Sequence, residues 1–310
     1  MNQDDPIPTL LAQVDAERMR RGLFYLAKDP LPFRKLNYTL PGHSKSTLHE
    51  ADDYIQAQLE SWGYVVEREA VRVQAFRCDR SKPPSRQWSA AHAGDLWYTA
   101  YNLYARKSGI ADAEKIVLLV AHKDSQSWID SPGAYDNAVG AVGVLEMARV
   151  LRPYQAHCSI CFLFCNEEHA PWTSVAAAKH ARARGDDIVA LFNTDGLGGK
   201  GPAEIAAGRK TNVTRYSALE GKWLADLMAQ VNETYRIGLE QSAYYDPRPG
   251  DDDGSFINEG YLSAVANLGS LPYADPNYHL ETDRPEAVDM ENVAMAVKAI
   301  LAAVVKVVSG

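Results

Sequence analysis

Cysteine is scarce in this chain of 310 residues, which contains four: Cys78, Cys158, Cys161 and Cys165. A protein of this size with so few cysteines does not depend on a framework of disulfides. Cys158 and Cys161 have CxxC spacing, but they lie in an apolar, strand-like run that would point their side chains to opposite faces. We therefore expect buried free thiols in a reducing compartment, and neither a redox motif nor a zinc knuckle.

Positive charge is also in deficit. The sequence has 32 lysines and arginines against 40 aspartates and glutamates, which gives a net charge of −8 at pH 7. Nucleic acids and anionic membranes attract basic surfaces, so this balance disfavours both as partners.

Long apolar runs are missing as well. Residues 1–22 begin with acidic side chains and contain no apolar core of the signal-peptide type. The longest apolar stretch, residues 293–308, carries Lys298 and Lys306, which is typical of a helix packed on a core and not of a membrane span. We therefore expect a cytoplasmic protein without a membrane segment.

The chain does show a regular alternation of strand-like and helix-like segments. Its composition, 46% hydrophobic and 23% charged, is that of a soluble globular protein with an ample core. The alternation predicts one catalytic α/β domain over residues 1–310, with a mixed, mainly parallel central sheet and helices on both faces. An irregular segment at residues 77–97 could cover a pocket or form a subunit contact, and we expect loops near the site at 243–256 and 269–286.

The individual elements follow from the spacing of apolar residues. Helices are predicted at residues 8–28, from a capping box at Thr47 and Glu50 to Gly63, at 138–151, 173–184 and 217–233, and from near Asp289 onward. Strands are predicted at residues 64–73, 99–107, 116–121, 159–165 and 188–196, with one more within 256–269.

The most informative stretch covers residues 116–143. Its apolar run indicates a strand buried on both faces, which ends abruptly at His122 and Asp124. Ligands of open α/β sheets bind just past the carboxyl ends of central strands. Residues two apart in an extended chain point to the same side, so Asp124 can orient His122 as a metal ligand. Asp136 follows at the entrance of the next helix, close in space to His122.

Three later segments repeat this pattern. Glu167 and Glu168 follow one predicted strand, Asp195 follows another, and His279 lies in the loop before the last helix. Any one of them alone is better explained as a capping, turn or surface residue, but their combined order is hard to explain in that way. Two histidines and three carboxylates, with Asp136 able to bridge, form a ligand set suited to two zinc ions.

Glu167 is then left over beside the predicted metals. Paired metal ions generate hydroxide near neutral pH and stabilise a tetrahedral intermediate. An unligated Glu167 could take the proton of the attacking water and deliver it to a leaving amine. The pattern therefore points to hydrolysis of an amide bond.

Five motifs together resemble a known family: AHKDS, SPGAYDNAVG, FCNEE, NTDGLG and NYHLETD. They are similar to those of the co-catalytic di-zinc exopeptidases of the bacterial leucyl aminopeptidase, aminopeptidase S and aminopeptidase Y type. The resemblance runs from the YIQAQLESWGY helix to the C-terminal helix. It implies the zinc exopeptidase fold, which is phosphorylase/hydrolase-like. It also implies two zinc ions per chain and an aminopeptidase that removes the N-terminal residue of peptides by a metal-bound hydroxide.

The resemblance also assigns ligands. It implies that His122 and Glu168 hold one zinc ion, that Asp195 and His279 hold the other, and that Asp136 bridges them. 

Further roles follow from the same resemblance. Glu167 would be the general base, and Asp124 would sit behind the first histidine. The family carries an acidic pair followed by a phenylalanine late in the chain, and Asp251, Asp252 and Phe256 match it. The match implies that this loop lies near the rim of the site.

The sequence departs from the family at three places. Lys123 replaces the usual aromatic residue between the histidine and the aspartate, Tyr135 replaces the acidic residue before Asp136, and EEHAPWTS lacks the glycine that is common after the two glutamates. We interpret all three as lining the approach to the site. Aromatic side chains that could form pocket walls or assist an oxyanion are Trp128, Trp172, Tyr244 and Tyr245.

Two other functions stay open. A glutaminyl-cyclase-like acyltransferase shares the fold and the Glu-Glu motif but uses a single zinc, and the retained His122 and the spacing of Asp136 argue against it. A non-enzymatic scaffold relative would keep the fold without metals, which the presence of all five ligands and Glu167 disfavours. The expected partner is a peptide or an aminoacyl small molecule, and the sequence does not predict an oligomeric state.

Overall fold

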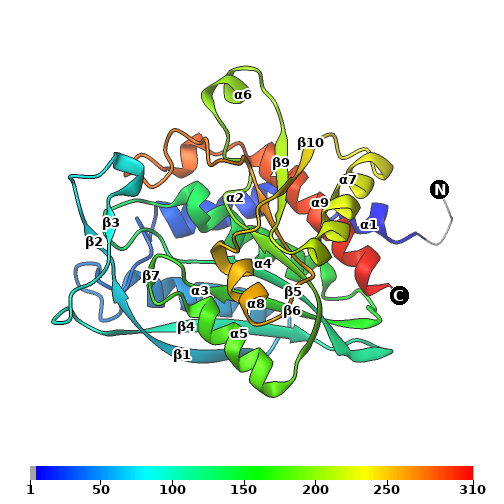
Figure 1. The fold of residues 1–310 in the computed structure, drawn as a ribbon, viewed down its shortest axis with the longest axis horizontal. Helices are drawn as coiled ribbons and strands as arrows, with labels where there is room; N and C mark the ends of the chain where they lie inside the picture. The colour runs from blue at the N-terminus through cyan, green and yellow to red at the C-terminus, as the bar shows by residue number, and fades with distance from the viewer. Residues whose placement is uncertain (1–4, 310) are drawn as a thin grey trace.

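A mixed sheet of nine strands forms the centre of the computed structural model, which describes residues 5–309 (Figure 1). Across the sheet the order is β10 (Glu240–Tyr245), β9 (Thr211–Tyr216), β11 (Ala264–Leu268), β8 (Asp187–Thr194), β5 (Asp112–His122), β6 (Cys158–Cys165), β4 (Tyr98–Lys107), β1 (Val66–Ala75) and β7 (His169–Ala170). The central strands β11, β8, β5 and β6 run parallel. Strands β4, β1 and β7 extend one side in antiparallel pairs, and β9 is antiparallel to β11. The predicted α/β class with a mixed, mainly parallel central sheet is confirmed.

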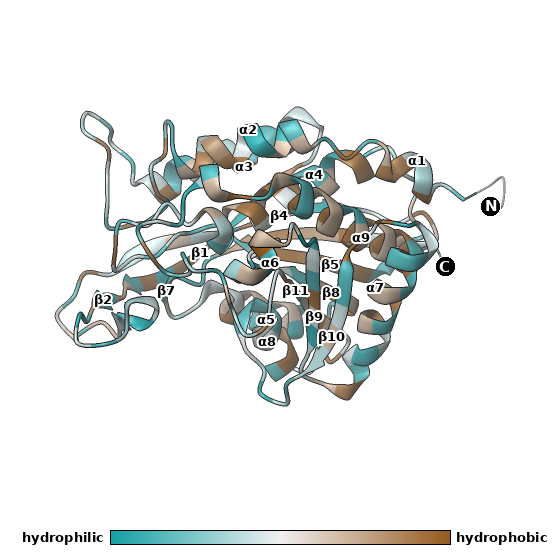
Figure 2. Cartoon of the chain, turned by 90° about the horizontal axis from the view of Figure 1, so that it is seen from above, coloured by the Kyte–Doolittle hydropathy of each residue, from teal (hydrophilic) through white to brown (hydrophobic). Residues whose placement is uncertain are grey.

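Helices cover both faces of this sheet (Figure 2). On one face lie α1 (Ile7–Leu11), α2 (Ala16–Ala27), α3 (Thr47–Ser61), α4 (Val139–Leu151), α7 (Lys222–Thr234) and α9 (Met290–Val308), which share the larger hydrophobic core. On the other face lie α5 (Thr173–Arg184) and α8 (Asp251–Asn258), over a smaller core. The short α6 (Pro202–Ala206) belongs to the connection between β8 and β9.

The central strand shows why the apolar run at 116–121 is continuous. Val117 and Leu119 pack into the larger core, whereas Leu118 and Val120 pack into the smaller one. Side chains of a strand alternate between the two faces, so a strand with a core on each side needs apolar residues at every position. The run ends at His122 because the strand leaves both cores there.

The first predicted helix, residues 8–28, is two helices. The helix is interrupted between α1 and α2. At the start of α2 the Asp15 side chain accepts a hydrogen bond from the backbone N–H of Arg18 at 2.9 Å. The capping residue of α3 is Ser46, one residue before the predicted Thr47, and the Thr47 hydroxyl hydrogen-bonds to Lys35 instead. Local caps therefore set these helix starts.

The region after α7 differs most from the prediction. The predicted loop at residues 243–256 contains the end of the edge strand β10 and most of α8. Asp251 to Asp253 form the first turn of α8, where the helix dipole favours negative charge. Phe256 is consequently helical, and only β11 remains of the strand predicted within residues 256–269. Strand β9 had no predicted counterpart.

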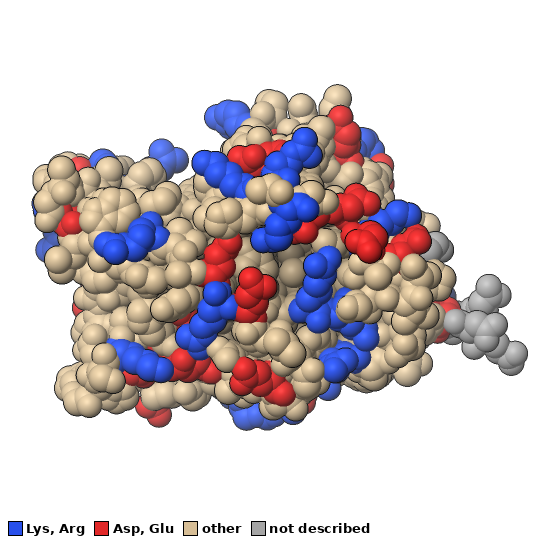
Figure 3. Space-filling view, turned by 90° about the horizontal axis from the view of Figure 1, so that it is seen from below, with Lys and Arg blue, Asp and Glu red and all other residues tan. Residues whose placement is uncertain are grey.

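The four cysteines all lie in the described part of the chain, and all have free thiols. Cys158 and Cys165 are buried and Cys161 is half-buried, but Cys78 is exposed, so the prediction of buried thiols is wrong for that residue. None of the helices within residues 5–309 is long and apolar enough to cross a bilayer. Residues 1–4, which begin the stretch examined for a signal peptide, lie outside the described residues. On the face shown in Figure 3, basic and acidic side chains are interspersed.

Candidate metal centre

The predicted ligands meet at the carboxyl edge of the parallel strands. His122 is the last residue of β5, Glu168 follows the end of β6, and Asp195 directly follows β8. Since these strands are parallel neighbours, their ends lie at one edge of the sheet. Asp136 arrives from the segment Ala134–Ala138 before α4, and His279 arrives from the loop between β11 and α9.

The five side chains form two groups that share Asp136. The first contains His122, whose Nε2 lies 3.2 Å from Asp136 Oδ1 and 3.4 Å from Asp195 Oδ1. In the second, His279 Nε2 lies 3.0 Å from Asp136 Oδ2 and 3.5 Å from Glu168 Oε1. The donor atoms of each group of three lie within 4.8 Å of one another, so each group could hold one metal ion.

This grouping corrects the pairing that the family resemblance implied. We expected His122 with Glu168 and Asp195 with His279, whereas the structure pairs His122 with Asp195 and His279 with Glu168. β5 lies between β6 and β8, and the acid after β8 approaches the end of β5, whereas the acid after β6 approaches His279. The shared position of Asp136 agrees with the expected bridge.

The charge of the cluster fits bound cations. Burial and the nearby Asp136 raise the pKa of Glu168 to about 7, and burial likewise raises the pKa of Asp195. Although burial opposes it, hydrogen bonds from His122 and His279 lower the pKa of Asp136. Buried carboxylates that repel one another are destabilising unless a positive charge lies between them. The oxygen and nitrogen donors suit zinc.

Asp124 lies behind the first group, as expected. Its carboxylate is buried, lies 3.3 Å from His122 Nδ1 and 2.8 Å from His169 Nδ1, and accepts the backbone N–H groups of Glu167 and Glu168 at 2.9 Å each. Although burial opposes it, the two histidines lower the pKa of Asp124. Asp124 is therefore a positioning residue, since it fixes a histidine ring and the Glu-Glu backbone without facing the cavity.

Two residues that the sequence did not single out hold Asp136 in place. The Asp283 carboxylate accepts the backbone N–H groups of Tyr135 at 2.9 Å and Asp136 at 3.1 Å. Arg34 is completely buried and donates to backbone carbonyls on both sides of the loop, at Lys123 and Gly133. Asp283 ends the NYHLETD motif, but the motif assigned it no role, and Arg34 lies outside the five motifs. These contacts are therefore visible only in the folded chain.

Glu167 faces the same cavity but belongs to neither group of ligands. Its Oε2 is buried without a hydrogen-bond partner among the described residues. Burial, followed by the charges of Asp252 and Asp251, raises the pKa of Glu167 well above its ordinary value. A carboxyl group with raised pKa is suited to accept and release a proton near neutral pH.

The cavity has a volume of about 290 Å³. Aromatic side chains form much of its wall, and acidic residues and histidines form its floor. The lining residues are Phe76, Trp88, His122, Trp128, Asp136, Glu167, Glu168, Trp172, Asp195, Asp251, Tyr278 and His279. Within residues 5–309, this lining includes no lysine or arginine, so the cavity favours cationic ligands.

Trp128 and Trp172, two of the predicted wall residues, are part of this lining. Trp128 is 8% exposed, packs edge-on against His279, and its indole Nε1 has no hydrogen-bond partner among the described residues. By contrast, Tyr244 and Tyr245 lie on the edge strand β10, 48% and 43% exposed, and do not line the cavity. The prediction of a wall role is therefore wrong for these two tyrosines.

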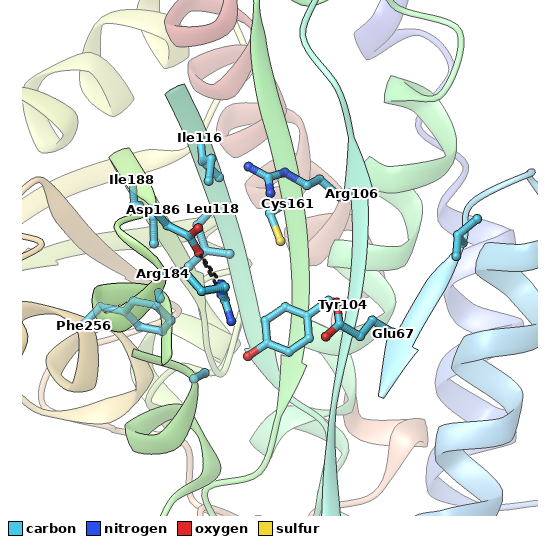
Figure 4. A pocket seen from close by; sticks show the side chains of 13 residues that line it. Glu67, Tyr104, Arg106, Ile116, Leu118, Cys161, Arg184, Asp186, Ile188 and Phe256 are labelled. Atoms are coloured by element: carbon cyan, nitrogen blue, oxygen red, sulfur yellow. Dashed lines mark hydrogen bonds and ion pairs between the residues drawn. The ribbon is translucent and has the colours of Figure 1, made fainter. Parts of the chain in front are cut away.

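Phe256 and Asp252 also differ from the expectation of a site rim. Phe256 is buried in the smaller core and lines a second cavity of about 390 Å³ between the sheet and helices α5 and α8 (Figure 4). There the charged side chains of Arg184 and Asp186 pair with each other at 2.7 Å. Asp252 is fully buried, neither of its carboxylate oxygens has a hydrogen-bond partner within residues 5–309, and burial raises its pKa to about 6. Its charge contributes to the raised pKa of Glu167.

Part of the irregular segment at residues 77–97 borders the cavity, through Ser85 and Trp88. The backbone carbonyl of Ser85 accepts a hydrogen bond from His279 Nδ1 at 3.0 Å, which fixes the ring orientation. Trp88, in the short strand β3 (Trp88–Ser89), packs against Phe76 and forms part of the wall. The tryptophans of this segment indicated in the sequence that it could cover a pocket, but the sequence did not predict which surface they would contact.

Lys123, Tyr135 and His169, the residue after the two glutamates, do not line the cavity, contrary to our interpretation, although Trp172 of the EEHAPWTS segment does. Lys123 is completely buried and forms an ion pair with Asp52 at 2.9 Å. Tyr135 packs into the larger core, and its hydroxyl accepts the backbone N–H of Asp289 at 2.9 Å. His169 is buried and contacts Asp124. These residues stabilise the loops of the site through buried contacts on the side away from the cavity.

Tyr273 is a further residue that sequence reasoning missed. Its hydroxyl lies 2.8 Å from Asp195 Oδ2 and 3.1 Å from Asp251 Oδ2, so it links a predicted ligand to the cavity wall. Asp251 is held in turn by Arg215 at 2.7 Å. These contacts fix the orientation of two carboxylates that face the cavity.

Comparisons with known proteins agree with this geometry. The chain is 22% identical to a protein of Pyrenophora teres f. teres (strain 0-1) named "Probable zinc metalloprotease", over 88% of this chain and 60% of that protein, so it spans less than two thirds of that relative. The fold is similar to an aminopeptidase from Aneurinibacillus sp. strain AM-1, with TM-score 0.71, 16% identity and coverage of 96% and 95%. It is also similar to Porphyromonas gingivalis glutaminyl cyclase, with TM-score 0.73, 16% identity and coverage of 96% and 99%. Residues 102–304, more than half of the chain, match the model of peptidase family M28. The chain therefore belongs to peptidase family M28.

Proposed function

We propose that this protein is a zinc-dependent aminopeptidase that binds two zinc ions per chain. The observation that carries the proposal is the pair of three-residue groups that share Asp136, beside a carboxyl group that joins neither. The three carboxylates of these groups, those of Asp136, Glu168 and Asp195, carry a charge of −3 when all are ionised. One divalent cation would leave part of that charge uncompensated, and two would compensate all of it.

His122 and Asp195 would hold one ion, Glu168 and His279 would hold the other, and Asp136 would be shared between them. Zinc in such sites polarises a carbonyl group and lowers the pKa of bound water. 

The residues of the chain supply the proton transfers. Glu167, whose raised pKa suits a general base near neutral pH, takes a proton from the attacking water. It then delivers this proton to the amine that leaves. Asp124 keeps the Glu167 backbone in position through its hydrogen bond to the N–H group.

The cavity favours the end of a peptide chain. Its volume of about 290 Å³ lies at the lower limit of ligand pockets, which range over about 300–1,000 Å³. Trp88, Trp128 and Tyr278 form part of its wall, and a cavity of this size suits one terminal residue better than a long stretch of chain. The Asp251 carboxylate lies on its wall, and because Arg215 and Tyr273 contact its Oδ2, a free ammonium group would approach its Oδ1.

The test compares aminoacyl p-nitroanilides that have free and acetylated amino groups. We expect hydrolysis of the free forms, loss of activity with chelator and restoration with zinc, and at least about a 100-fold loss for Glu167→Gln. Equal rates on free and acetylated substrates would contradict an aminopeptidase.

A single-zinc glutaminyl-cyclase-like acyltransferase is the second candidate. Asp136, Glu168 and His279 form a complete set of three ligands by themselves, and the fold is similar to that of a glutaminyl cyclase. Release of pyroglutamate from a peptide with N-terminal glutamine, without hydrolysis of other peptides, would favour it over the aminopeptidase.

A further inference from the structure

One polar side chain at the candidate metal centre has no role in the chemistry described so far. Gln126 is fully buried, two residues after Asp124. Its Nε2 lies 2.9 Å from Asp136 Oδ2 and 2.8 Å from Glu168 Oε1. These are the same two oxygen atoms that approach His279 Nε2. Its own Oε1 is buried and has no partner among the described residues.

The Gln126 amide nitrogen and His279 Nε2 each lie close to the same two carboxylate oxygen atoms. The separations among the Gln126 amide, Asp136 Oδ2, Glu168 Oε1 and His279 Nε2 that the structure records lie between 2.8 and 3.5 Å. Zinc–ligand distances of about 2.0–2.1 Å place the corners of a tetrahedron about 3.3 Å apart. The carboxamide nitrogen therefore lies at about the separation expected between two ligands of one ion from both carboxylate oxygen atoms of the group formed by Asp136, Glu168 and His279.

The orientation of the carboxamide depends on the charge that it faces. When only carboxylates lie in front of it, the N–H donors point toward them, as here. With a cation among the same carboxylates, the N–H groups would point at positive charge. Rotation of the amide by 180° points Oε1 at the carboxylates and moves Nε2 to the buried position where Oε1 has no partner among the described residues. One buried atom lacks a partner in either orientation, so the presence of a cation determines which orientation is favoured.

We propose that Gln126 is a ligand of the second metal ion, through Oε1, and thereby completes the site formed by Asp136, Glu168 and His279. The inference rests on the proposed metal centre and adds a residue to it. Carboxamide oxygens bind divalent cations less tightly than carboxylates or imidazoles. Gln126 therefore makes the second ion more weakly held than a carboxylate at this position would.

The test measures metal binding directly. The affinities of the two ions are determined by competition with a chromophoric chelator for the wild type, Gln126→Leu and Gln126→Glu, with Gln230→Leu on the exposed surface of α7 as the matched control. Gln126→Leu should weaken the second ion by at least about 10-fold and leave the first unchanged. Gln126→Glu, which keeps an oxygen but removes the N–H donors, should bind the second ion as tightly as the wild type or more tightly. The control should match the wild type.

A second readout separates ligation from charge. Cobalt in the second site should show a visible spectrum in Gln126→Leu that differs from that of the wild type, and Gln126→Glu should retain the intensity of the wild type.

Several results would overturn the inference. An unchanged affinity and cobalt spectrum in Gln126→Leu would show that the side chain does not contact the ion. Equal weakening in both variants would show that the amide acts as an N–H donor, and tighter binding in Gln126→Leu would show that it obstructs the site. If the wild type binds fewer than two ions, the proposed metal centre fails before Gln126 is tested, so the two failures are distinguishable.

Discussion

Replacement of Asp124 by asparagine should destabilise the fold and weaken metal binding together. The buried carboxylate accepts the N–H groups of Glu167 and Glu168, and it lies within reach of Nδ1 of His122 and His169. Asparagine offers one oxygen and one N–H₂ group, so about two of these four contacts lose their acceptor. A hydrogen bond to a charged group contributes about 1.5–3 kcal/mol, so the expected loss of unfolding free energy is about 3–6 kcal/mol.

The assay is urea unfolding of the metal-free protein, followed by zinc titration of the folded fraction. Asp226→Asn is the matched control, because Asp226 pairs with Lys222 on the exposed surface of α7, and it should change the unfolding free energy by less than about 1 kcal/mol. The ion held by His122 should bind about 10- to 100-fold more weakly in Asp124→Asn. If Asp124→Asn matches its control in both stability and zinc affinity, the role assigned to Asp124 is wrong.

Three further predictions concern residues around the site. Lys123→Met leaves Asp52 buried without its partner and should cost about 3–5 kcal/mol of unfolding free energy. Because burial raises the pKa of Asp52, the variant should regain stability as the pH falls. A loss of stability that does not depend on pH would contradict this. Trp128→Phe removes from the cavity wall the indole N–H that has no partner among the described residues. It should lower kcat/KM by about 2- to 10-fold by raising KM, and it should leave the free energy of unfolding unchanged. An unchanged kcat/KM would show that the substrate does not accept this hydrogen bond. Tyr245→Ala, on the exposed edge strand, should leave kcat/KM within about 2-fold of the wild type, and a larger loss would place substrate on that strand.

The position of the site could be predicted from sequence because local patterns determine it. A fully apolar run that ends in His122 indicates a central strand and its carboxyl end, and acids after later strands follow the same rule. The five candidate ligands were identified in this way, and the structure brings them together. The pairing of His122 with Asp195 was not predictable, because it depends on the order of strands across the sheet.

What the sequence could not predict depends on contacts between distant segments. Lys123 lies between two residues of the site motif, yet it points to a buried partner, Asp52, about 70 positions away in the chain, and not to the substrate approach. Trp88 reaches the cavity from an irregular segment, where no periodicity indicates a direction. Phe256 matched a family position but lies in α8, because the acidic run before it starts a helix.

The most direct test of the account is the zinc content of the purified chain and of Asp195→Ala. The protein is purified without chelator, refilled with zinc, dialysed and analysed by elemental mass spectrometry. The account predicts two ions per wild-type chain and one in Asp195→Ala, which keeps the complete group formed by Asp136, Glu168 and His279. One ion in the wild type, or two in Asp195→Ala, would contradict the two-metal centre as assigned.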